Sequence, residues 1–241
     1  MQLSDTHPVS LELSPGGGWI NRPPAADQRV RTGDPERRLM EAMLLVSGER
    51  GYAEISVQTV ISRAKASRNT FYRHFSDKED CFTRAYEAGM DELLRQIIEP
   101  AHRADDWLAG VRAGATALVR VLEAEPAVAR ALLLEAFPAG RRTMDKRAEA
   151  MRRIAAELDR ARSQLPAESE PMPALTSEIV VGGLESLVRL HLQESSPPRA
   201  IELLPDLVYF AINPYLGGET AGEQAAIARA EADRLARELG A

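Results

Sequence analysis

The chain has 241 residues, of which 44% are hydrophobic, and its formal net charge is −6. This length can hold one large or two modest domains, and the few aromatics (five Phe and five Tyr) beside abundant Ala, Leu, Arg and Glu favour helices over sheets. The sequence has no apolar run of about 18 residues, no basic start followed by an apolar block and one cysteine, Cys81. These features argue against a membrane span, a secretory signal and an intramolecular disulfide, and we expect a cytoplasmic protein.

The charge is distributed unevenly along the chain. Residues 28–80 contain ten Lys and Arg against eight Asp and Glu, a net charge of +2, whereas residues 81–241 carry −6. A locally basic module on an acidic body suits selective binding to nucleic acid, because excess nonspecific attraction is avoided. A difference of this size alone is also compatible with chance.

The N-terminal segment differs from the rest of the chain. Residues 1–33 lack helical periodicity and are interrupted by glycines and prolines, which predicts a flexible arm. Its arginines could touch phosphate, or the arm could simply be disordered. Asp34 as N-cap and Pro35 at the first helical position begin the first predicted helix, and Gly51 ends it. Its expected inner face consists of Leu39, Met40, Met43, Leu44 and Ser47.

Two short helices follow the first one. Ser56 can cap a helix over residues 57–64, and Ser67 can cap a second over residues 68–75. Only residues 65–66 separate them. Two short helices joined by so tight a turn predict a helix-turn-helix, in which the second helix enters the major groove of DNA.

The second of these helices has two distinct faces. Phe71 and Phe75 stand four residues apart and share the buried face. The remaining surface carries hydrogen-bonding side chains, among which Arg68, Asn69 and Arg73 are the best candidates for base edges. Arg can form two hydrogen bonds with guanine, and Asn can form two with adenine.

The same region carries a specific combination of residues. The runs Gly51-Tyr52, Ile55-Ser56-Val57, Val60-Ile61 and Ser67-Arg68-Asn69-Thr70-Phe71-Tyr72-Arg73-His74-Phe75-Ser76-Asp77-Lys78-Glu79 occur together. With them, roughly residues 34–82 resemble the DNA-binding domain of the tetracycline-repressor (TetR) family of regulators. One departure is Lys65, since the family usually has Gly in this turn. A left-handed residue other than Gly costs about 1 kcal/mol there.

The resemblance implies which side chains contact DNA. It implies that Tyr72 and His74 touch phosphates or bases, although both could simply complete the surface of the head. It also implies that Lys78 contacts a phosphate, and the start of the preceding helix offers amides and a favourable dipole for another. The predicted DNA-binding residues are Ser56, Gln58, Ser67, Arg68, Asn69, Thr70, Tyr72, Arg73, His74 and Lys78.

A long helix is expected to join this head to the rest of the chain. Ser76 and Glu79 form a capping box for a helix over residues 77–99, and Pro100 is expected to stop it. Apolar periodicity and Pro or Gly breaks predict further helices over residues 105–123, 126–137 and 141–164.

An effector pocket between the body helices is usual in the resembled family. Large apolar residues on these helices could line it or could be ordinary core: Tyr86, Met90, Trp107, Phe137 and Met144, with Val111 and Met151 beside them. Trp107 is the best of them, since Trp is common where an apolar surface meets a polar rim. The basic run within residues 141–153 is either a solvated face or a site for an anionic effector.

Two later segments, residues 175–192 and 201–216, are apolar around much of their circumference, so each should be buried on more than one face. Gly182-Gly183 permits close helix approach. With the resemblance, this predicts a helix pair that packs against its own copy in a homodimer; the alternative is a monomer core. The predicted interface residues are Val180, Leu184, Leu187, Leu204, Leu207 and Val208. Residues 219–239 form an amphipathic tail that is expected to pack on the body.

The sequence lacks the motifs of common enzyme sites. It has no His-Glu-x-x-His, no Cys-x-x-Cys, no phosphate-binding loop and no metal-ligand set at usable spacing, so we predict neither an enzyme, a metal nor a cofactor. We predict an all-α protein with an arm (1–33), a three-helix helix-turn-helix head (34–80) and a helical-bundle body for effector binding and dimerisation (81–241).

The expected function follows from the head, the body and the resemblance together. We expect a homodimeric, ligand-responsive regulator, usually a repressor in such families, that binds a palindromic operator in double-stranded DNA and responds to an unidentified small molecule, without a membrane partner. The alternative is a dimeric small-molecule-binding helical protein that no longer reads DNA.

Overall fold

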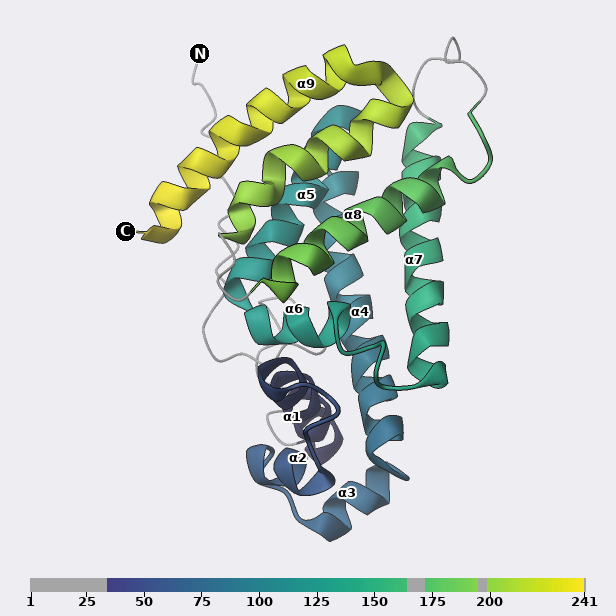
Figure 1. Cartoon of the computed structure of the whole chain (residues 1–241), viewed down its shortest axis with the longest axis vertical. Helices are drawn as coiled ribbons and strands as arrows, with labels where there is room; N and C mark the ends of the chain where they lie inside the picture. The colour runs from purple at the N-terminus through teal and green to yellow at the C-terminus, as the bar shows by residue number, and fades with distance from the viewer. Residues whose placement is uncertain (1–33, 164–171, 195–198, 241) are drawn as a thin grey trace, which may run out of the picture.

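The computed structural model of the chain describes residues 34–163, 172–194 and 199–240. Over these residues the chain forms nine α-helices and a 3-10 helix, with no strand (Figure 1), which confirms the all-α prediction. The predicted arm, residues 1–33, lies outside the described residues. The α-helices are α1 (Pro35–Arg50), α2 (Val57–Arg63), α3 (Arg68–His74), α4 (Lys78–His102), α5 (Trp107–Ala124), α6 (Pro126–Leu133), α7 (Arg141–Arg162), α8 (Thr176–Gln193) and α9 (Leu204–Gly240); the 3-10 helix spans Ala200–Leu203.

The head consists of α1, α2 and α3, at the bottom of Figure 1. The three predicted N-caps, Asp34, Ser56 and Ser67, each accept a hydrogen bond from a backbone N–H in the first helical turn. Phe71 and Phe75 are almost wholly buried, with 0% and 1% of their surface exposed. Side-chain oxygens thus satisfy the free amides at the helix starts, and the aromatic pair holds α3 against α1 and α2.

One glycine allows the head to touch the body directly. A Cβ added at Gly48 in α1 would lie 1.7 Å from the backbone oxygen of Ala127 in α6, far inside van der Waals contact. The main chains of α1 and α6 therefore meet there, and only a residue without a side chain fits. Head and body are joined by this contact as well as by α4.

The start and the end of α4 differ from the sequence prediction. The predicted capping box of Ser76 and Glu79 is wrong: Asp77 is the N-cap and accepts from the backbone N–H of Asp80 at 2.8 Å. Asp80 in turn accepts from the backbone N–H of Ser76 at 3.0 Å, so the first turn is closed by aspartates. α4 also passes through the predicted head–body boundary after residue 80.

Pro100 does not stop α4, which continues to His102. A proline removes its own N–H, but the residues after it can still donate to carbonyls before it. The backbone N–H of Arg103 reaches the carbonyl of Glu99 at 3.3 Å in this way. The helix therefore ends about one turn later than expected.

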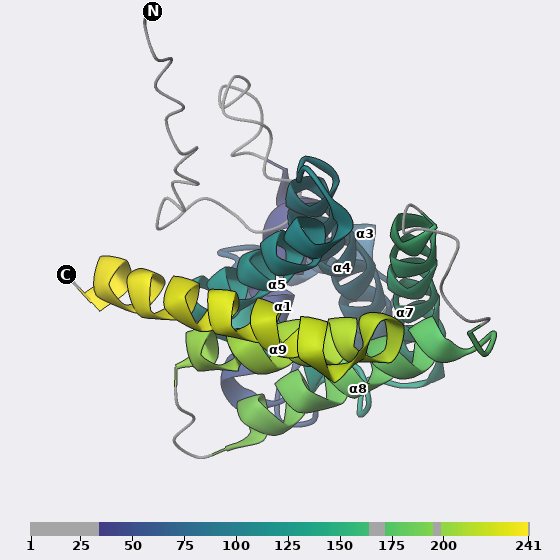
Figure 2. The ribbon, with the colours of Figure 1, turned by 90° about the horizontal axis from the view of Figure 1, so that it is seen from above.

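The body is a bundle of α5 to α9 around the upper part of α4. Seen from above, α9 runs across the top of the molecule (Figure 2). The chain leaves helical geometry at Gly217, where φ is +78°, and turns back along the bundle. Ala221, Ala228 and Leu235 after this bend are buried, and Arg112 of α5 bonds the side chain of Gln224, which confirms that the C-terminal segment packs on the body.

No helix among the described residues has the length and apolar character needed to cross a membrane. Within the same residues, no group of three or more His, Cys, Asp and Glu side chains is placed to hold a metal ion.

Candidate nucleic-acid interface and internal cavity

Helix α3 presents a row of polar side chains on the outside of the head. Because Phe71 is buried, Arg68, Asn69 and Arg73 lie exposed, and 49% of the surface of Tyr72 is accessible. The guanidinium of Arg68 lies 5.8 Å from the centre of the Tyr72 ring. A small outward face of cationic, amide and phenolic donors results, of the kind that can bond both phosphate oxygens and base edges.

Other predicted contact residues have structural partners at the starts of the two helices. Ser67 accepts from the backbone N–H of Thr70 at 3.0 Å, and the two hydroxyl oxygens lie 2.8 Å apart. Ser56 forms a capping box with Thr59 in α2, and the exposed Gln58 donates to Ser62 at 3.3 Å. The structure thus gives Ser56 and Ser67 capping roles beside the predicted DNA contact.

The turn between α2 and α3 has the geometry expected from its length. Lys65 has φ of +50°, and within the described residues it is the one residue other than Gly with positive φ. This confirms that the turn needs a left-handed residue, which is the reason Gly would fit it better.

Lys78 lies partly inside the head. Its ammonium donates to the backbone carbonyls of Tyr52 at 2.9 Å and Ile55 at 3.0 Å, and it sits 4.1 Å from the centre of the Tyr52 ring. Desolvation lowers the pKa of Lys78, and burial together with the nearby Glu79 carboxylate raises the pKa of Tyr52 to about 12. A contact of Lys78 with phosphate stays a prediction, with one ammonium donor left to make it.

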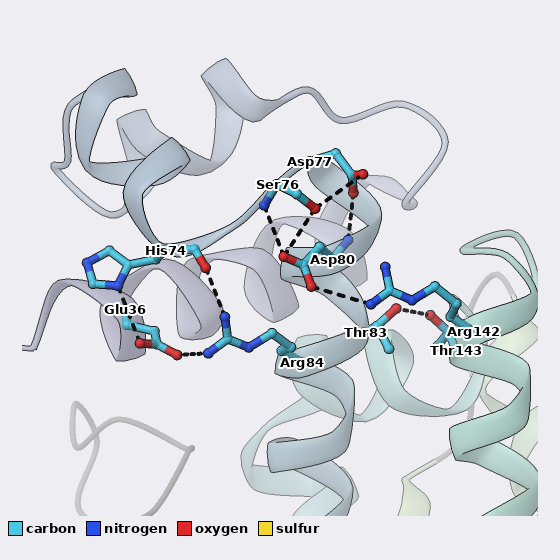
Figure 3. Close-up of polar contacts among 9 residues, drawn as sticks. All are labelled: Glu36, His74, Ser76, Asp77, Asp80, Thr83, Arg84, Arg142 and Thr143. Carbon is cyan, nitrogen blue, oxygen red and sulfur yellow. Dashed lines mark hydrogen bonds and ion pairs between the residues drawn. The ribbon is translucent and has the colours of Figure 1, made fainter.

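The ring of His74 points toward Glu36 of α1 (Figure 3). Its Nδ1 lies 3.3 Å from a carboxylate oxygen of Glu36 in α1, whose other oxygen pairs with Arg84 of α4. Arg84 also donates to the carbonyl of His74 at 2.9 Å. This cluster ties the end of α3 to α1 and α4. Sequence reasoning missed Glu36 and Arg84, because nothing in their local pattern indicates contacts 38 and 10 residues away in the chain.

The body contains a cavity of about 470 Å³ between α4, α5 and α7, closed by residues of α6, α8 and α9. Met90 and Trp107 line it as predicted, but Tyr86, Phe137 and Met144 are not among its lining residues. Tyr86 is buried in the core, and Phe137 is partly exposed, with the guanidiniums of Arg147 and Arg189 over its ring. The missed lining residues include Leu93, Leu94, Ile97 and Ile98, whose helical spacing on α4 was the available signal.

The basic run of α7 is largely exposed, as a solvated face would be, and several of its side chains pair with carboxylates. Arg142 pairs with Asp80 at 3.6 Å, Lys146 pairs with Glu87 at 2.6 Å and Arg153 pairs with Asp91, all across to α4. Arg147 donates from Nε to Glu185 of α8 at 2.9 Å. Between the ion pairs, the buried hydroxyls of Thr83 and Thr143 meet at 2.8 Å (Figure 3). The run therefore fastens α7 along α4.

Most of the predicted dimer-interface residues lie in the core of the single chain. Val180, Leu204, Leu207 and Val208 are buried in the single chain, and Leu184 and Leu187 are partly buried against its core, so an interface built from them needs correction. The apolar residues that these helices expose are others: Leu175, Ile179 and Leu190 on α8 or just before it, and Phe210 on α9. Periodicity could not separate the two faces, because both are apolar.

Comparisons with known proteins bear on the head and on the fold. Residues 39–85 match the model of the tetR family of bacterial regulatory proteins. An uncharacterized HTH-type transcriptional regulator of Bacillus subtilis (strain 168), YfiR, is 29% identical over 72 residues, which cover 30% of this chain and 35% of that protein. The match thus spans about a third of the length of that curated relative.

Solved structures resemble the chain over most of its length. The fatty acid degradation regulator FadR from Bacillus halodurans aligns with a TM-score of 0.62 at 16% identity, covering 77% of this chain and 97% of that one. The transcriptional regulator FadR from Bacillus subtilis, in complex with stearoyl-CoA, aligns with a TM-score of 0.60 at 14% identity, covering 75% and 97%. At these identities the likeness establishes the fold: a helix-turn-helix head on a helical body.

Proposed function

The head of this chain belongs to the tetR family of bacterial regulatory proteins, and from that premise we propose that the protein regulates transcription by binding operator DNA as a homodimer in the cytoplasm. The observation that carries the proposal is the arrangement of α3. Its aromatic pair is buried in the head while Arg68, Asn69, Tyr72 and Arg73 project outward. A helix held in this way can enter a major groove with its polar face toward the bases.

Within this interface the side chains have different tasks. Arg68 and Asn69 lie in the first turn of α3 and read base edges through paired hydrogen bonds. Tyr72 and the amide-rich start of α2 hold phosphates, which position the head without reading sequence. Two heads in one dimer read half-sites about 34–36 Å apart, which makes the operator a near-palindrome.

The homodimer forms through the exposed face of α8 and α9. Ile179 and Leu190 are 70% and 58% exposed, and Phe210 is 54% exposed. Between Ile179 and Leu190, Gly182 and Gly183 have open space where a side chain would be, so a partner helix can approach closely. Exposed apolar residues with small residues between them are typical of a helix–helix contact.

The body cavity supports a response to a small molecule. Its volume lies in the usual range for ligand pockets, and a similarly folded regulator has been solved in complex with stearoyl-CoA. α4 and α7 both line the cavity and are fastened to each other next to the head. An effector that fits only one arrangement of these helices changes the separation of the heads and releases the operator, so that the protein acts as a repressor.

The test is a gel-shift on the upstream region of the protein's own gene, followed by selection of binding sites from a random pool. We expect Tyr72→Ala to weaken binding to all sequences, whereas Arg68→Ala or Asn69→Ala relaxes selectivity by about 1–3 kcal/mol at one base pair. Arg229→Ala, on the distant C-terminal part of α9, is the control.

Unchanged affinity of the three head variants would rule out this placement of α3. A chain that binds small molecules but no DNA in either assay would instead be the small-molecule-binding protein that no longer reads DNA.

A further inference from the structure

The inner wall of the body cavity has almost no free hydrogen-bonding group for a polar ligand atom. It is built from apolar side chains of α4, α5 and α7, including Leu93, Ile97, Leu118 and Ile154. The carboxylate of Glu185 borders it, but both of its oxygens bond Arg147. A polar ligand atom placed here would lose its hydrogen bonds to water without replacement. The buried part of a ligand is therefore hydrocarbon.

The indole N–H of Trp107 does not change this conclusion. Trp107 lines the cavity and its Nε1 has no hydrogen-bond partner, but that atom has essentially no accessible surface. It is covered by the protein, so a ligand in the cavity cannot reach it.

One end of the cavity has a different character, and we call it the rim: His102 at the end of α4, with Glu157 and Arg160 of α7. His102 Nε2 lies 3.1 Å from one oxygen of Glu157, and Arg160 bonds the other oxygen. The side chains of His102 and Arg160 are 52% and 60% exposed, so the rim faces solvent. It spans the gap between two of the cavity walls.

Arg160 supplies unused hydrogen-bond donors at the rim. Both oxygens of Glu157 are engaged, and the nearby carboxylate of Asp106 accepts from the backbone N–H of Ala109 at 2.7 Å. A guanidinium has five N–H donors in a planar fork that matches a carboxylate or phosphate, and Arg160 uses only part of them. The free N–H groups of Arg160 can thus bind an anionic acceptor at the rim.

The size of the cavity limits the hydrocarbon. A dry cavity of about 150 Å³ accommodates one benzene ring, and this cavity measures about 470 Å³. By that proportion it holds on the order of eighteen carbon atoms. A single long chain suits the space between α4, α5 and α7.

We propose that the cavity binds an anionic amphiphile: a single long hydrocarbon chain lies inside, and a carboxylate or phosphate end is held at the rim by Arg160. This proposal rests on the proposed function for its regulatory meaning, but binding itself can be measured without DNA. An amphiphile accounts for both features of the cavity, the apolar walls and the charged rim at one end.

The experiment compares three probes that share a fourteen-carbon chain, below their micelle concentrations, by titration calorimetry of the full chain. The probes are tetradecanoate, tetradecanol and tetradecyltrimethylammonium; dodecyl phosphate then separates a phosphate end from a carboxylate end. We expect one tetradecanoate per chain, bound about fivefold or more tightly than the alcohol and tighter again than the cation.

Two variants locate the head group and the chain. Arg160→Glu should weaken tetradecanoate about fivefold to tenfold and remove the preference over the cation. Arg234→Glu is the matched control, because Arg234 is 61% exposed and pairs with a glutamate three residues earlier, as Arg160 does, but lies outside the cavity. Ala115→Phe, which fills the cavity from α5, should abolish binding of all three probes, with the thermal melt as a check on folding.

Equal affinity for the three head groups, or equal losses in Arg160→Glu and Arg234→Glu, would overturn the proposal. A gel-shift on the same preparations keeps the two ideas apart. DNA binding without head-group preference contradicts the amphiphile alone, whereas selective tetradecanoate binding without DNA binding contradicts only the proposed function.

Discussion

Lys78 shows how the setting of a single residue decides its role. A lysine at the start of a helix near a DNA-binding surface suggests a phosphate contact, yet two backbone carbonyls and the Tyr52 ring surround this ammonium. Because these carbonyls belong to the loop between α1 and α2, Lys78 holds that loop against α4. The ammonium of Lys78 therefore stabilises the conformation of the head.

This setting gives a measurable expectation for Lys78→Met, which keeps most of the apolar stem and removes the donors. The two carbonyls lose their partner, so the free energy of unfolding should fall by about 1–3 kcal/mol in urea denaturation. Lys65→Met makes the same chemical change at an exposed lysine and should stay within about 0.5 kcal/mol. Equal midpoints for Lys78→Met and the unmodified chain would show that the carbonyls are satisfied by water.

Lys65 gives a second expectation at this scale. Its φ of +50° is a conformation in which a Cβ approaches the backbone, so Lys65→Gly should raise the free energy of unfolding by about 1 kcal/mol. Lys65→Ala keeps the Cβ and should bring no such gain. Urea denaturation of both variants makes the comparison, and a lower stability of the Gly variant would refute the strain.

Among the helices, the contact between α4 and α7 combines surface and buried interactions. The side chains of Lys146 and Glu87 are 36% and 47% exposed, so solvent screens the attraction between them. Thr83 and Thr143 are 5% and 0% exposed, and each hydroxyl is the other's partner. The hydroxyl pair is therefore the part of this contact that is sensitive to the position of α7.

A double-mutant cycle tests this contact. Thr83→Val leaves the buried hydroxyl of Thr143 without a partner and should cost about 1–3 kcal/mol of stability, whereas Thr83→Val with Thr143→Val together should be close to neutral. The coupling energy comes from the unfolding free energies of the four proteins. Additive losses would mean that the two hydroxyls do not depend on each other.

The proposed homodimer depends on the exposed apolar face of α8. Ile179→Glu places a charge in the centre of the exposed apolar face, so it should shift the protein from dimer to monomer and weaken operator binding. Sedimentation velocity measures the first effect and a gel-shift measures the second.

Ile227→Glu is the control for this experiment, because Ile227 is also half exposed but lies on the C-terminal part of α9. It should leave the dimer intact. A dimer that survives Ile179→Glu and dissociates with Ile227→Glu would move the interface to that segment.

The sequence predicted what depends on local chemistry. Helix starts at Asp34, Ser56 and Ser67 follow from side chains that cap their own first turn, and the head follows from the spacing of Phe71 and Phe75. It failed where the outcome depends on partners distant in the chain. Which of several apolar faces borders a cavity, a neighbouring helix or solvent is decided by the packing of the whole bundle. Val180, Leu204, Leu207 and Val208, which were placed at the dimer interface and are buried in the single chain, show this.

The bare contact at Gly48 has a mechanical consequence. Main chain presses on main chain there, with no compressible side chain between α1 and α6. The head therefore cannot rotate independently of α6 at this contact. Since Leu133 of α6 also borders the cavity, two helices, α4 and α6, connect the cavity with the head. A rotation of α3 then depends on the difference between the displacements of α4 and α6.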